Sequence, residues 1–402
     1  MKNNTLFENI ILIQARIMRA TKAYIYQDNL KNNLNEIKKL LKENTKICLA
    51  VKADGYGHNA VAVSKIAEDF GVEFLAVASV DEGIELRENG IKANILLLSL
   101  CTPSEMKELF EYNITPLVFS EEYIKCLSEQ ADVYYKDSNL KHDVHLAVDT
   151  GMGRIGCYSD QAAMQAKLIA QSAHLKLAGM ITHFALADGV SEAAQDFTSA
   201  QYKDFVKAVE AVKAEGIDPG ICSCGSSAAL MTHPEMHFDM VRPGIIAYGY
   251  YPDEVTRDYL AQHGINVNLK PVLSFETEVV AIRHFPAGKS VSYGRTWISD
   301  KETDIAVLPL GYADGLLRRF SPGLQVTING KNYPVVGRIC MDQCMVDIGN
   351  NNQNVKLWDK VLIFGPEESG ALQSAEALAA LGKTISYEVL TSLTKRVIRY
   401  LK

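Results

Sequence analysis

Eight short apolar runs, separated by segments with helical periodicity, constrain the fold of this 402-residue chain more than any other feature. Each run is nearly continuous in apolar residues, as in strands that are buried on both faces. Strands that alternate with helices pair in parallel, and eight such units favour an α/β fold of the closed (β/α)8, or TIM, barrel type, with an open doubly wound sheet as the alternative. The runs occupy residues 48–53, 74–79, 94–99, 115–120, 143–149, 177–184, 220–225 and 238–249.

The pattern changes after Pro252, where strand-like runs follow one another without helices between them. The dipeptide Asn329-Gly330 lies between two such runs and is typical of a two-residue hairpin turn. A second domain, mainly β, is therefore expected. The predicted organisation is an N-terminal extension over residues 1–18, the barrel over 19–261 and the mainly β domain over 262–402.

Composition narrows the classes of partner. The net charge of -7 disfavours a broad surface for nucleic acid or an anionic membrane, so small molecules are the expected partners. No apolar run approaches the roughly 18 residues that span a bilayer, and Met1–Arg19 lacks the features of a signal peptide. The eight cysteines lack zinc-site spacing and are expected to be reduced structural thiols. We therefore expect a cytoplasmic protein with no metal site.

Polar residues stand at the ends of five apolar runs. In a (β/α)8 barrel the reactive groups lie at the carboxyl ends of the strands, so these residues are expected to converge on one rim. An isolated buried arginine or histidine is more often structural, and the convergence is what favours a site. The run-end residues are Lys52, Asp149 with Arg154, His183, Ser227 and Arg242.

Lys52 is the most informative of them, because a lysine at a buried strand end has its pKa lowered by desolvation, which suits a Schiff-base nucleophile. An ion pair with Asp149 explains its position equally well. Gly225 and Gly244, with Ser227, could donate hydrogen bonds to a phosphate near the last two strands, where barrels often bind one. The two glycines could equally mark tight turns.

Eight segments, in order and covering about residues 19–402, resemble the alanine racemase family. Ala50–His58 resembles the segment that contains the cofactor lysine of that family. The others are Val148–Gly156, Thr182–Ala185, Val241–Ile245, Val291–Gly294, Leu310–Gly315, Gly337–Gln343 and Tyr387–Glu388. The resemblance implies a fold-type III isomerase that uses pyridoxal 5'-phosphate to interconvert L-alanine and D-alanine, supplying D-alanine for peptidoglycan.

The resemblance also implies roles for individual residues. Lys52 would hold the cofactor covalently and act as the base that faces the D-enantiomer. Tyr293, from the second subunit of a homodimer with composite sites, would be the base that faces the L-enantiomer, helped by hydrogen bonds through His183 and Arg242. Arg242 would also face the pyridine nitrogen of the cofactor. The phosphate would be held by Tyr56, Ser227, Gly244, Ile245 and Tyr387, and the substrate would meet Arg154, Met341 and Tyr312.

Two positions depart from the family pattern. Members often carry a carbamylated lysine two residues before Asp149, where this chain has Ala147, which cannot pair with Arg154. Either an anion or water fills that gap, or other neighbours position Arg154. Ser226 replaces a frequent asparagine, and we expect this change to be tolerated.

Three other functions compete with alanine racemisation. Amino-acid decarboxylases share the barrel and its cofactor lysine, but the signature of their second domain is not found in matching form. A cofactor-carrying protein without catalysis would resemble the barrel alone and would leave the Tyr293 and Met341 segments unexplained. Racemisation of serine, or of several amino acids, by a relative of the same family is the closer alternative, because an apolar pocket rejects an added hydroxyl only weakly.

Overall fold

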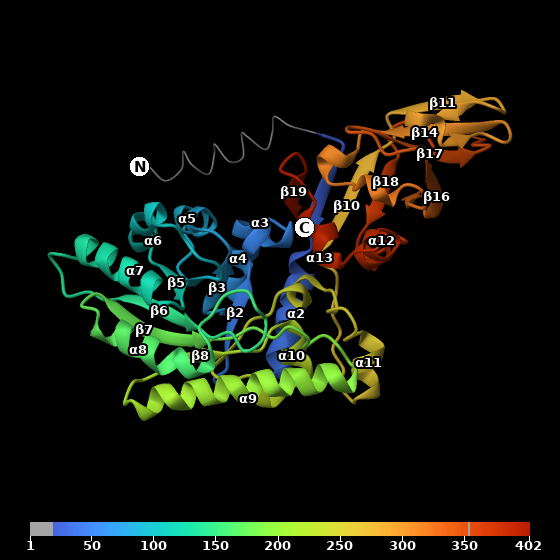
Figure 1. Cartoon of the computed structure of the whole chain (residues 1–402). Coiled ribbons are helices and arrows are strands. Elements are labelled where there is room, and N and C mark those ends of the chain that lie inside the picture. The colour runs from blue at the N-terminus through green and yellow to red at the C-terminus, as the bar shows by residue number, and fades with distance from the viewer. Residues whose placement is uncertain (1–18, 353) are drawn as a thin grey trace. The chain divides into compact units, whose positions relative to one another are not determined.

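The structure is a computed structural model that describes residues 19–352 and 354–402, and it contains two compact units (Figure 1). The barrel unit comprises Gln27–Val272. The β unit combines the described residues up to Tyr26 with Leu273–Lys402. The expected extension over residues 1–18 lies outside the described residues.

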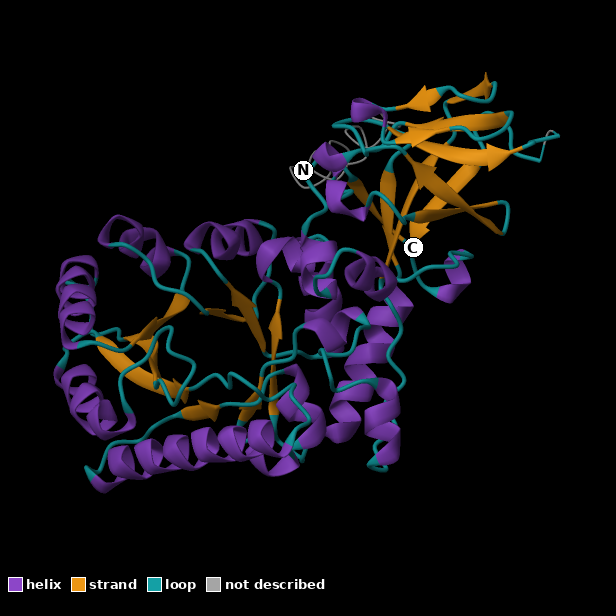
Figure 2. Cartoon of the chain, turned by 45° about the vertical axis from the view of Figure 1, so that its right-hand side comes forward, coloured by secondary structure: helices purple, strands orange, loops and turns teal. Residues whose placement is uncertain are grey.

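Eight parallel strands form the barrel unit's sheet, in the order β8-β7-β6-β5-β4-β3-β2-β9. Its two ends meet where the backbone N–H of Arg242 donates to the carbonyl of Gly225 at 2.8 Å, so the barrel is nearly closed. The expected barrel is thereby confirmed, and Figure 2 shows the strands ringed by helices. The strands are β2 (Lys46–Ala50), β3 (Phe74–Val77), β4 (Asn94–Leu97), β5 (Ile114–Val118), β6 (His142–Ala147), β7 (Leu175–Ile181), β8 (Ile221–Ser223) and β9 (Met240–Val241).

The last strand is shorter than its apolar run. Pairing in β9 ends after Val241, and Ile245–Tyr248 forms a 3-10 helix, η4. Pro243 lacks the backbone N–H that a further ladder bond needs, which explains why the strand cannot continue through the run 238–249. The prediction of a strand over the whole run 238–249 was therefore wrong for the residues after Val241.

Side chains fill the inside of the barrel, which is a packed core and not a channel. Burying each large apolar side chain contributes roughly 1.5–3 kcal/mol, so this layer fixes the strands whose ends carry the polar residues. The buried cluster comprises Cys48, Phe74, Ala76, Leu96, Leu117, Ala147, Ile181 and Met240.

Helices cover the outside of the barrel, and their starts follow from local sequence (Figure 1). The side chains of Ser79, Ser120 and Ser191 each accept a backbone N–H from three residues further on, which caps the first turn. The helices are α2 (Gln27–Leu40), α4 (Ala60–Phe70), α5 (Val80–Glu88), α6 (Met106–Glu111), α7 (Glu121–Tyr134), α8 (Ala162–Gln171), α9 (Glu192–Ala214), α10 (Ser227–Thr232) and α11 (Arg257–Gln262).

The β unit is built on a nine-stranded sheet in the order β11-β14-β17-β16-β15-β18-β10-β1-β19, with a separate β12-β13 pair. Asn329-Gly330 forms the expected hairpin turn between β15 and β16, with φ of 50° and 74°. The elements are β1 (Lys22–Ile25), β10 (Leu273–Glu278), β11 (Ala281–Phe285), β12 (Ser290–Val291), β13 (Trp297–Ile298), β14 (Thr303–Leu308), β15 (Gln325–Ile328), β16 (Lys331–Val336), β17 (Cys344–Gly349), β18 (Lys360–Phe364), β19 (Ile398–Leu401), α12 (Ala375–Leu381) and α13 (Ser386–Thr391).

The strand β1 belongs to the β unit, although the sequence placed residues 19–261 in the barrel domain. It pairs antiparallel with β10 and parallel with β19, between them in the sheet. These partners lie far along the chain, so no local pattern indicates the pairing. Within the described ranges, no helix is long and apolar enough to cross a membrane.

Candidate active site at the carboxyl rim of the barrel

The chain turns sharply where β2 ends, and Lys52 lies at the start of that turn. Ala53 (φ 54°, ψ 51°), Asp54 (φ 54°, ψ 46°) and Gly55 (φ 61°, ψ 46°) take left-handed conformations, and φ is also positive at the next two residues, Tyr56 and Gly57. This conformation costs roughly 1–2 kcal/mol for each residue other than glycine. The fold must therefore stabilise the turn, here called the Lys52 turn (Lys52–Tyr56).

Glu82 at the start of α5 supplies part of that stabilisation. One of its carboxylate oxygens accepts the N–H of Ala53 at 2.7 Å, and the other accepts the N–H of Ala78 at 2.7 Å. Glu82 was not among the residues predicted from the sequence. Ser79 and Glu82 have the spacing of a capping box, and that spacing predicts an acidic side chain turned back toward the preceding strand end.

The electrostatic surroundings of Lys52 favour its neutral amine. Burial lowers the pKa of the Lys52 ammonium, the positive charges of Arg154 and Arg242 lower it further, and Glu82 partly opposes them. A neutral amine is the nucleophilic form of lysine. The expected alternative, an ion pair with Asp149, is not among the interactions that shift this pKa.

Arg242 lies buried where β9 ends and is held by neutral oxygens. Its guanidinium donates to the hydroxyl of Ser223 at 2.6 Å and to the carbonyl of Thr182 at 2.6 Å. It also donates to Nδ1 of His183 at 3.4 Å. An arginine carries donors only, so Nδ1 of His183 must accept and the ring proton lies on Nε2.

His183 is neutral at physiological pH. Burial lowers its pKa to about 3, and the charges of Arg242, Arg154 and Lys52 add to the effect. These shared influences indicate that the four side chains, which come from the ends of four different strands, lie close together on the rim. The expected convergence of Lys52, Arg154, His183 and Arg242 is therefore a feature of the structure.

A small backbone cradle lies between the Lys52 turn and the last two strands. Gly244 donates its N–H to the hydroxyl of Ser227 at 2.9 Å. A Cβ atom at Gly244 would stand 2.7 Å from the hydroxyl oxygen of Tyr56, so a larger residue there would have to displace the Tyr56 ring. Tyr56 stacks on Tyr248 with ring centroids 4.8 Å apart, and Ile245 follows Gly244 in the buried η4 turn. The arrangement gathers hydroxyl and backbone donors at one point.

The loop after β6 carries Arg154, whose side chain is exposed on the rim. The carboxylate of Asp149 accepts the N–H groups of Gly151 at 2.9 Å and Gly153 at 3.1 Å, which folds this loop on itself. Ala147, at the position of the family's lysine, packs inside the barrel core. Asp149 therefore orders the loop rather than neutralising Lys52.

The other predicted site residues belong to the β unit, where three of them are exposed. The exposed fractions are 68% for Tyr293, 52% for Met341 and 40% for Tyr312. Hydrogen bonds join their loops. The hydroxyl of Ser292 donates to the carbonyl of Arg338 at 2.6 Å, and the backbone N–H of Tyr312 donates to the carbonyl of Cys340 at 3.0 Å. We call this group the Tyr293 surface (Tyr293, Tyr312 and Met341).

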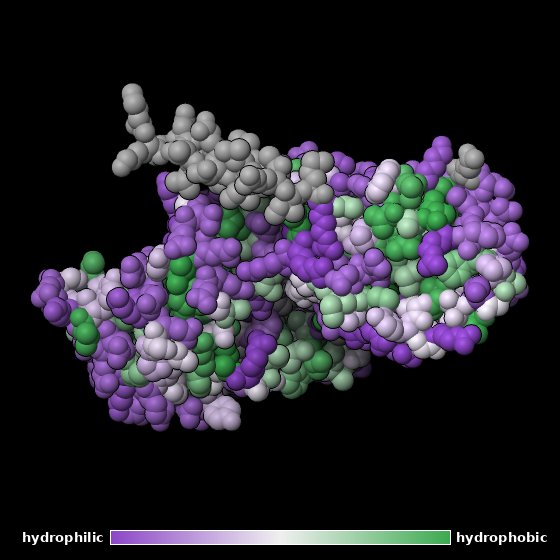
Figure 3. Space-filling model, turned by 90° about the horizontal axis from the view of Figure 1, so that it is seen from above, coloured by the Kyte–Doolittle hydropathy of each residue, from purple (hydrophilic) through white to green (hydrophobic). Residues whose placement is uncertain are grey.

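Hydrophobic side chains gather on part of the exposed face of the β unit (Figure 3). Large apolar and aromatic side chains left exposed on a folded protein commonly mark a surface that binds a partner.

The remaining predicted residue, Tyr387, lies on α13 and is half-buried. The predicted set is thus divided, with eight residues on the barrel rim and four on the β unit.

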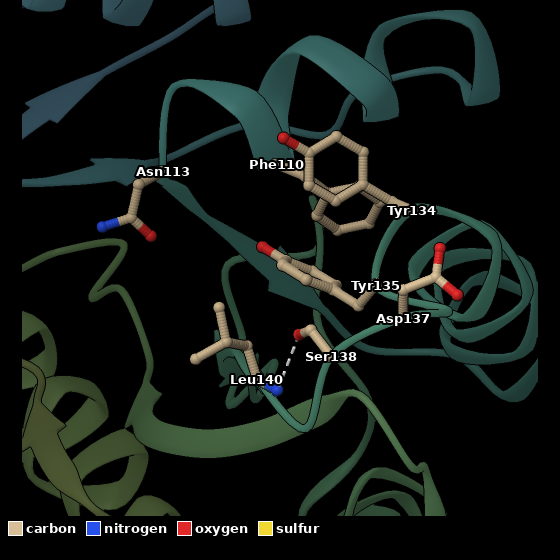
Figure 4. Close-up of a pocket in the computed structure, with 7 residues that line it drawn as sticks. All are labelled: Phe110, Asn113, Tyr134, Tyr135, Asp137, Ser138 and Leu140. Carbon is tan, nitrogen blue, oxygen red and sulfur yellow. Dashed lines mark hydrogen bonds between the residues drawn. The ribbon is translucent and has the colours of Figure 1, made fainter.

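A cavity lies away from the rim residues, and Figure 4 shows the side chains that line it. Its volume is about 440 Å³ and its walls include Phe110, Tyr134 and Tyr135. Asn113 and Leu140, which also line it, precede β5 and β6, so the cavity lies at the amino ends of the strands. Catalytic groups of such barrels come from the carboxyl ends, so this cavity is separate from the candidate site. Among the described residues, no cluster of histidine, cysteine and acidic side chains has the make-up of a metal site.

Two family models match the chain in succession. The model described as "Alanine racemase, N-terminal domain" matches residues 25–252, and "Alanine racemase, C-terminal domain" matches residues 272–401. A protein that resembled the barrel alone would leave the second match unexplained. The curated alanine racemase of Treponema denticola is 47% identical over 384 residues, covering 95% of this chain and 98% of that protein.

Solved structures agree over the same length. The structure of alanine racemase from Clostridium difficile 630 has a TM-score of 0.87 and 38% identity, covering 96% of this chain and 97% of that one. The alanine racemase of Bacillus anthracis with bound L-Ala-P has a TM-score of 0.87 and 34% identity, and 96% of each chain is covered. Both halves of the sequence, and the fold of both units, agree in one assignment: the chain belongs to the alanine racemase family.

Proposed function

We propose that this protein interconverts L-alanine and D-alanine with pyridoxal 5'-phosphate bound at the barrel rim. The observation that carries the proposal is the lysine amine at the end of β2, with its pKa lowered, beside Arg242, Arg154 and a neutral His183. When bound, pyridoxal phosphate withdraws electrons from the α-carbon of an amino acid and so makes the α-proton removable. The protein's own residues must then remove and return that proton.

The rim residues fit this cofactor. Gly244 lets the hydroxyl of Tyr56 approach its backbone closely, and the cradle brings together the hydroxyls of Tyr56 and Ser227, which suits a phosphate group. Because Ser227 accepts the N–H of Gly244, its own hydroxyl hydrogen remains available to donate. Lys52 would hold the cofactor covalently, Arg242 would face its ring nitrogen, and Ile245 and Tyr387 would add contacts to the phosphate.

Inversion at the α-carbon needs two bases on opposite faces, since one proton leaves one face and another arrives at the other. Lys52 would serve the face of the D-enantiomer. The partner subunit's Tyr293 would serve the face of the L-enantiomer, while Arg154 and the partner subunit's Met341 backbone would bind the substrate carboxylate. The partner subunit's Tyr312 would narrow the entrance.

Tyrosine with its usual pKa near 10 is a weak base at neutral pH, so its phenolate needs a donor. The geometry at His183 suits that task. Arg242 donates to Nδ1, which leaves a proton on Nε2 that His183 can donate to a phenolate oxygen. The fixed charge of Arg242 would also keep the ring nitrogen of the cofactor unprotonated, because a guanidinium cannot accept a proton.

This division of roles implies a homodimer with composite sites. The support is the exposure of the Tyr293 surface, which presents its side chains outward on the β unit. Mixing inactive Lys52→Ala and Tyr293→Phe chains should restore activity, because each heterodimer contains one site with both bases intact. Proven subunit exchange without recovered activity would contradict the composite site. A location in the cytoplasm stays a prediction.

The direct test is a racemisation assay of the purified protein with added pyridoxal phosphate and a panel of L-amino acids. Alanine is expected to react fastest, and a faster rate with serine would assign the alternative substrate. Lys52→Ala should lose both racemisation and the visible absorbance of the covalently held cofactor. A Lys52→Ala protein that kept both would overturn the assignment of Lys52.

A further inference from the structure

A buried glutamine on α9 lies against the rim and has no role in the function proposed above. The helix packs on the barrel through a stripe that includes Thr198, Gln201, Phe205 and Ala208. Gln201 is only 1% exposed. A glutamine at a core position of an amphipathic helix is costly unless all its polar atoms find partners.

The amide of Gln201 joins two rim loops. Its nitrogen donates to the hydroxyl of Thr150 at 3.3 Å and to the carbonyl of His183 at 3.3 Å. Its oxygen accepts the N–H of Ala185 at 3.0 Å. The amide cannot be turned over, because its nitrogen would then face the N–H of Ala185 and two donors would meet. One side chain therefore connects the loop after β6 with the loop after β7.

The bonds continue from Gln201 toward the charged centre of the rim. The hydroxyl of Thr150, which accepts from Gln201, is also hydrogen-bonded to the hydroxyl of Thr182, 2.8 Å away. The carbonyl of Thr182 accepts from Arg242 at 2.6 Å. The chain of bonds thus runs from the outer helix to the arginine beside His183.

Close packing accompanies these bonds. A Cβ atom at Gly151 would stand 2.9 Å from the ring of Phe197 and 3.5 Å from the side chain of Gln201. The backbone of the Arg154 loop thus lies directly on α9, over the turn that carries both side chains. Displacing Gln201 would loosen the loop on the side where Asp149 does not hold it.

We propose that Gln201 is a positioning residue of the reaction, which fixes the Arg154 loop and the His183 loop relative to each other. The inference rests on the proposed function for the roles of Arg154 and His183. It also favours one of the two explanations for Ala147: a neighbour other than the missing lysine orders the loop of Arg154. A loop held this way presents the guanidinium to the substrate carboxylate without having to be ordered first.

The test compares Gln201→Met with Thr198→Val in the holoenzyme. Methionine keeps the length of glutamine and removes its hydrogen bonds. Thr198 lies one turn earlier on the same face and is fully buried, and its hydroxyl has no hydrogen-bond partner among residues 19–352 and 354–402. Thr198→Val therefore changes a matched position without cutting the connection. Three quantities are measured: amide hydrogen exchange over residues 149–156 and 183–186, the dissociation constant of propionate, and kcat and KM for alanine. Propionate is a carboxylate without the reacting amino group.

In the Gln201→Met protein the backbone amides of both loops should exchange faster with solvent, propionate should bind about tenfold more weakly, and KM should rise. Each lost hydrogen bond to an ordered loop is worth about 1 kcal/mol, or a factor of about five. Thr198→Val should stay within about twofold of the unaltered protein. Equal loop exchange and equal propionate binding in the two variants would overturn the proposal.

Two further outcomes remain decisive. If Gln201→Met does not fold, Thr150→Val, which removes the hydroxyl that bonds to both Gln201 and Thr182, should weaken propionate binding, and Thr150→Ser, which keeps the hydroxyl, should restore it. No difference between these two variants would also overturn the proposal. If the unaltered protein does not racemise alanine, the proposed function fails, but the comparison of loop exchange still tests the positioning role of Gln201.

Discussion

Substituting Gly244 by alanine tests the cofactor cradle directly. The new Cβ would lie 2.7 Å from the hydroxyl oxygen of Tyr56 and 3.3 Å from the ring carbon that bears it. The ring cannot retreat freely, because Tyr56 is 8% exposed and stacks on Tyr248, which is fully buried. Overpacking of this kind costs about 1–3 kcal/mol. If the cost falls on the cofactor-bound state, the dissociation constant of pyridoxal phosphate should rise by about 5-fold to 150-fold.

The assay is a titration of cofactor-free protein with pyridoxal phosphate, followed by absorbance. Gly225→Ala is the matched control, because a Cβ there would make only ordinary contacts, at 3.5 Å and beyond. A double-mutant cycle isolates the cause: in a Tyr56→Phe background the hydroxyl is gone, so Gly244→Ala should cost less than it does alone. An undiminished cost in that background, or an equal effect of Gly225→Ala, would refute the steric reasoning.

Two other predictions concern proton transfer and pH. Tyr293→Phe should abolish solvent hydrogen exchange at the α-carbon of L-alanine while D-alanine still exchanges through Lys52; equal loss from both enantiomers would mean that Tyr293 does not serve one face as a base. Burial lowers the pKa of His145 in the folded protein to about 4. As pH falls from about 6.5 toward 4, this imidazole is protonated in the unfolded chain but not in the folded one, so the folded state loses stability. His145→Gln should therefore reduce the loss of unfolding free energy between pH 7 and pH 5 by up to about 2 kcal/mol, measured by urea denaturation of the cofactor-free protein, and an unchanged loss would contradict this account.

The barrel and much of its rim could be predicted because both depend on local patterns. Continuous apolar runs identify buried parallel strands, and a polar residue that interrupts the later part of such a run is expected at a strand end. Lys52, His183 and Arg242 were found by that rule. The dipeptide Asn329-Gly330 similarly predicted its hairpin because the turn needs left-handed residues at both positions.

The features that escaped prediction depend on partners far away in the sequence. Ala53 and Asp54 have no intrinsic preference for a left-handed turn, and they adopt it where Glu82, from the next βα unit, accepts the N–H of Ala53. Gln201 interrupts the apolar stripe of α9, and the sequence does not show the three partners on two loops that satisfy its amide. A single sequence reports which residues are out of place but not which contacts compensate them.

The position of β1 has a consequence for how the protein is made. Lys22–Ile25 is synthesised before the whole barrel unit, yet one of its two neighbours in the sheet, β19 at Ile398–Leu401, is synthesised after it. At about 5–20 residues per second, β1 waits roughly 20 to 75 seconds for that partner. The whole barrel unit, Gln27–Val272, is complete in the interval and can fold as an insertion within an unfinished β unit. Until β19 is made, at least one edge of β1 stays unpaired and open to adventitious pairing with other nascent chains, so the yield of folded protein should depend on chaperones that shield this edge in the interval.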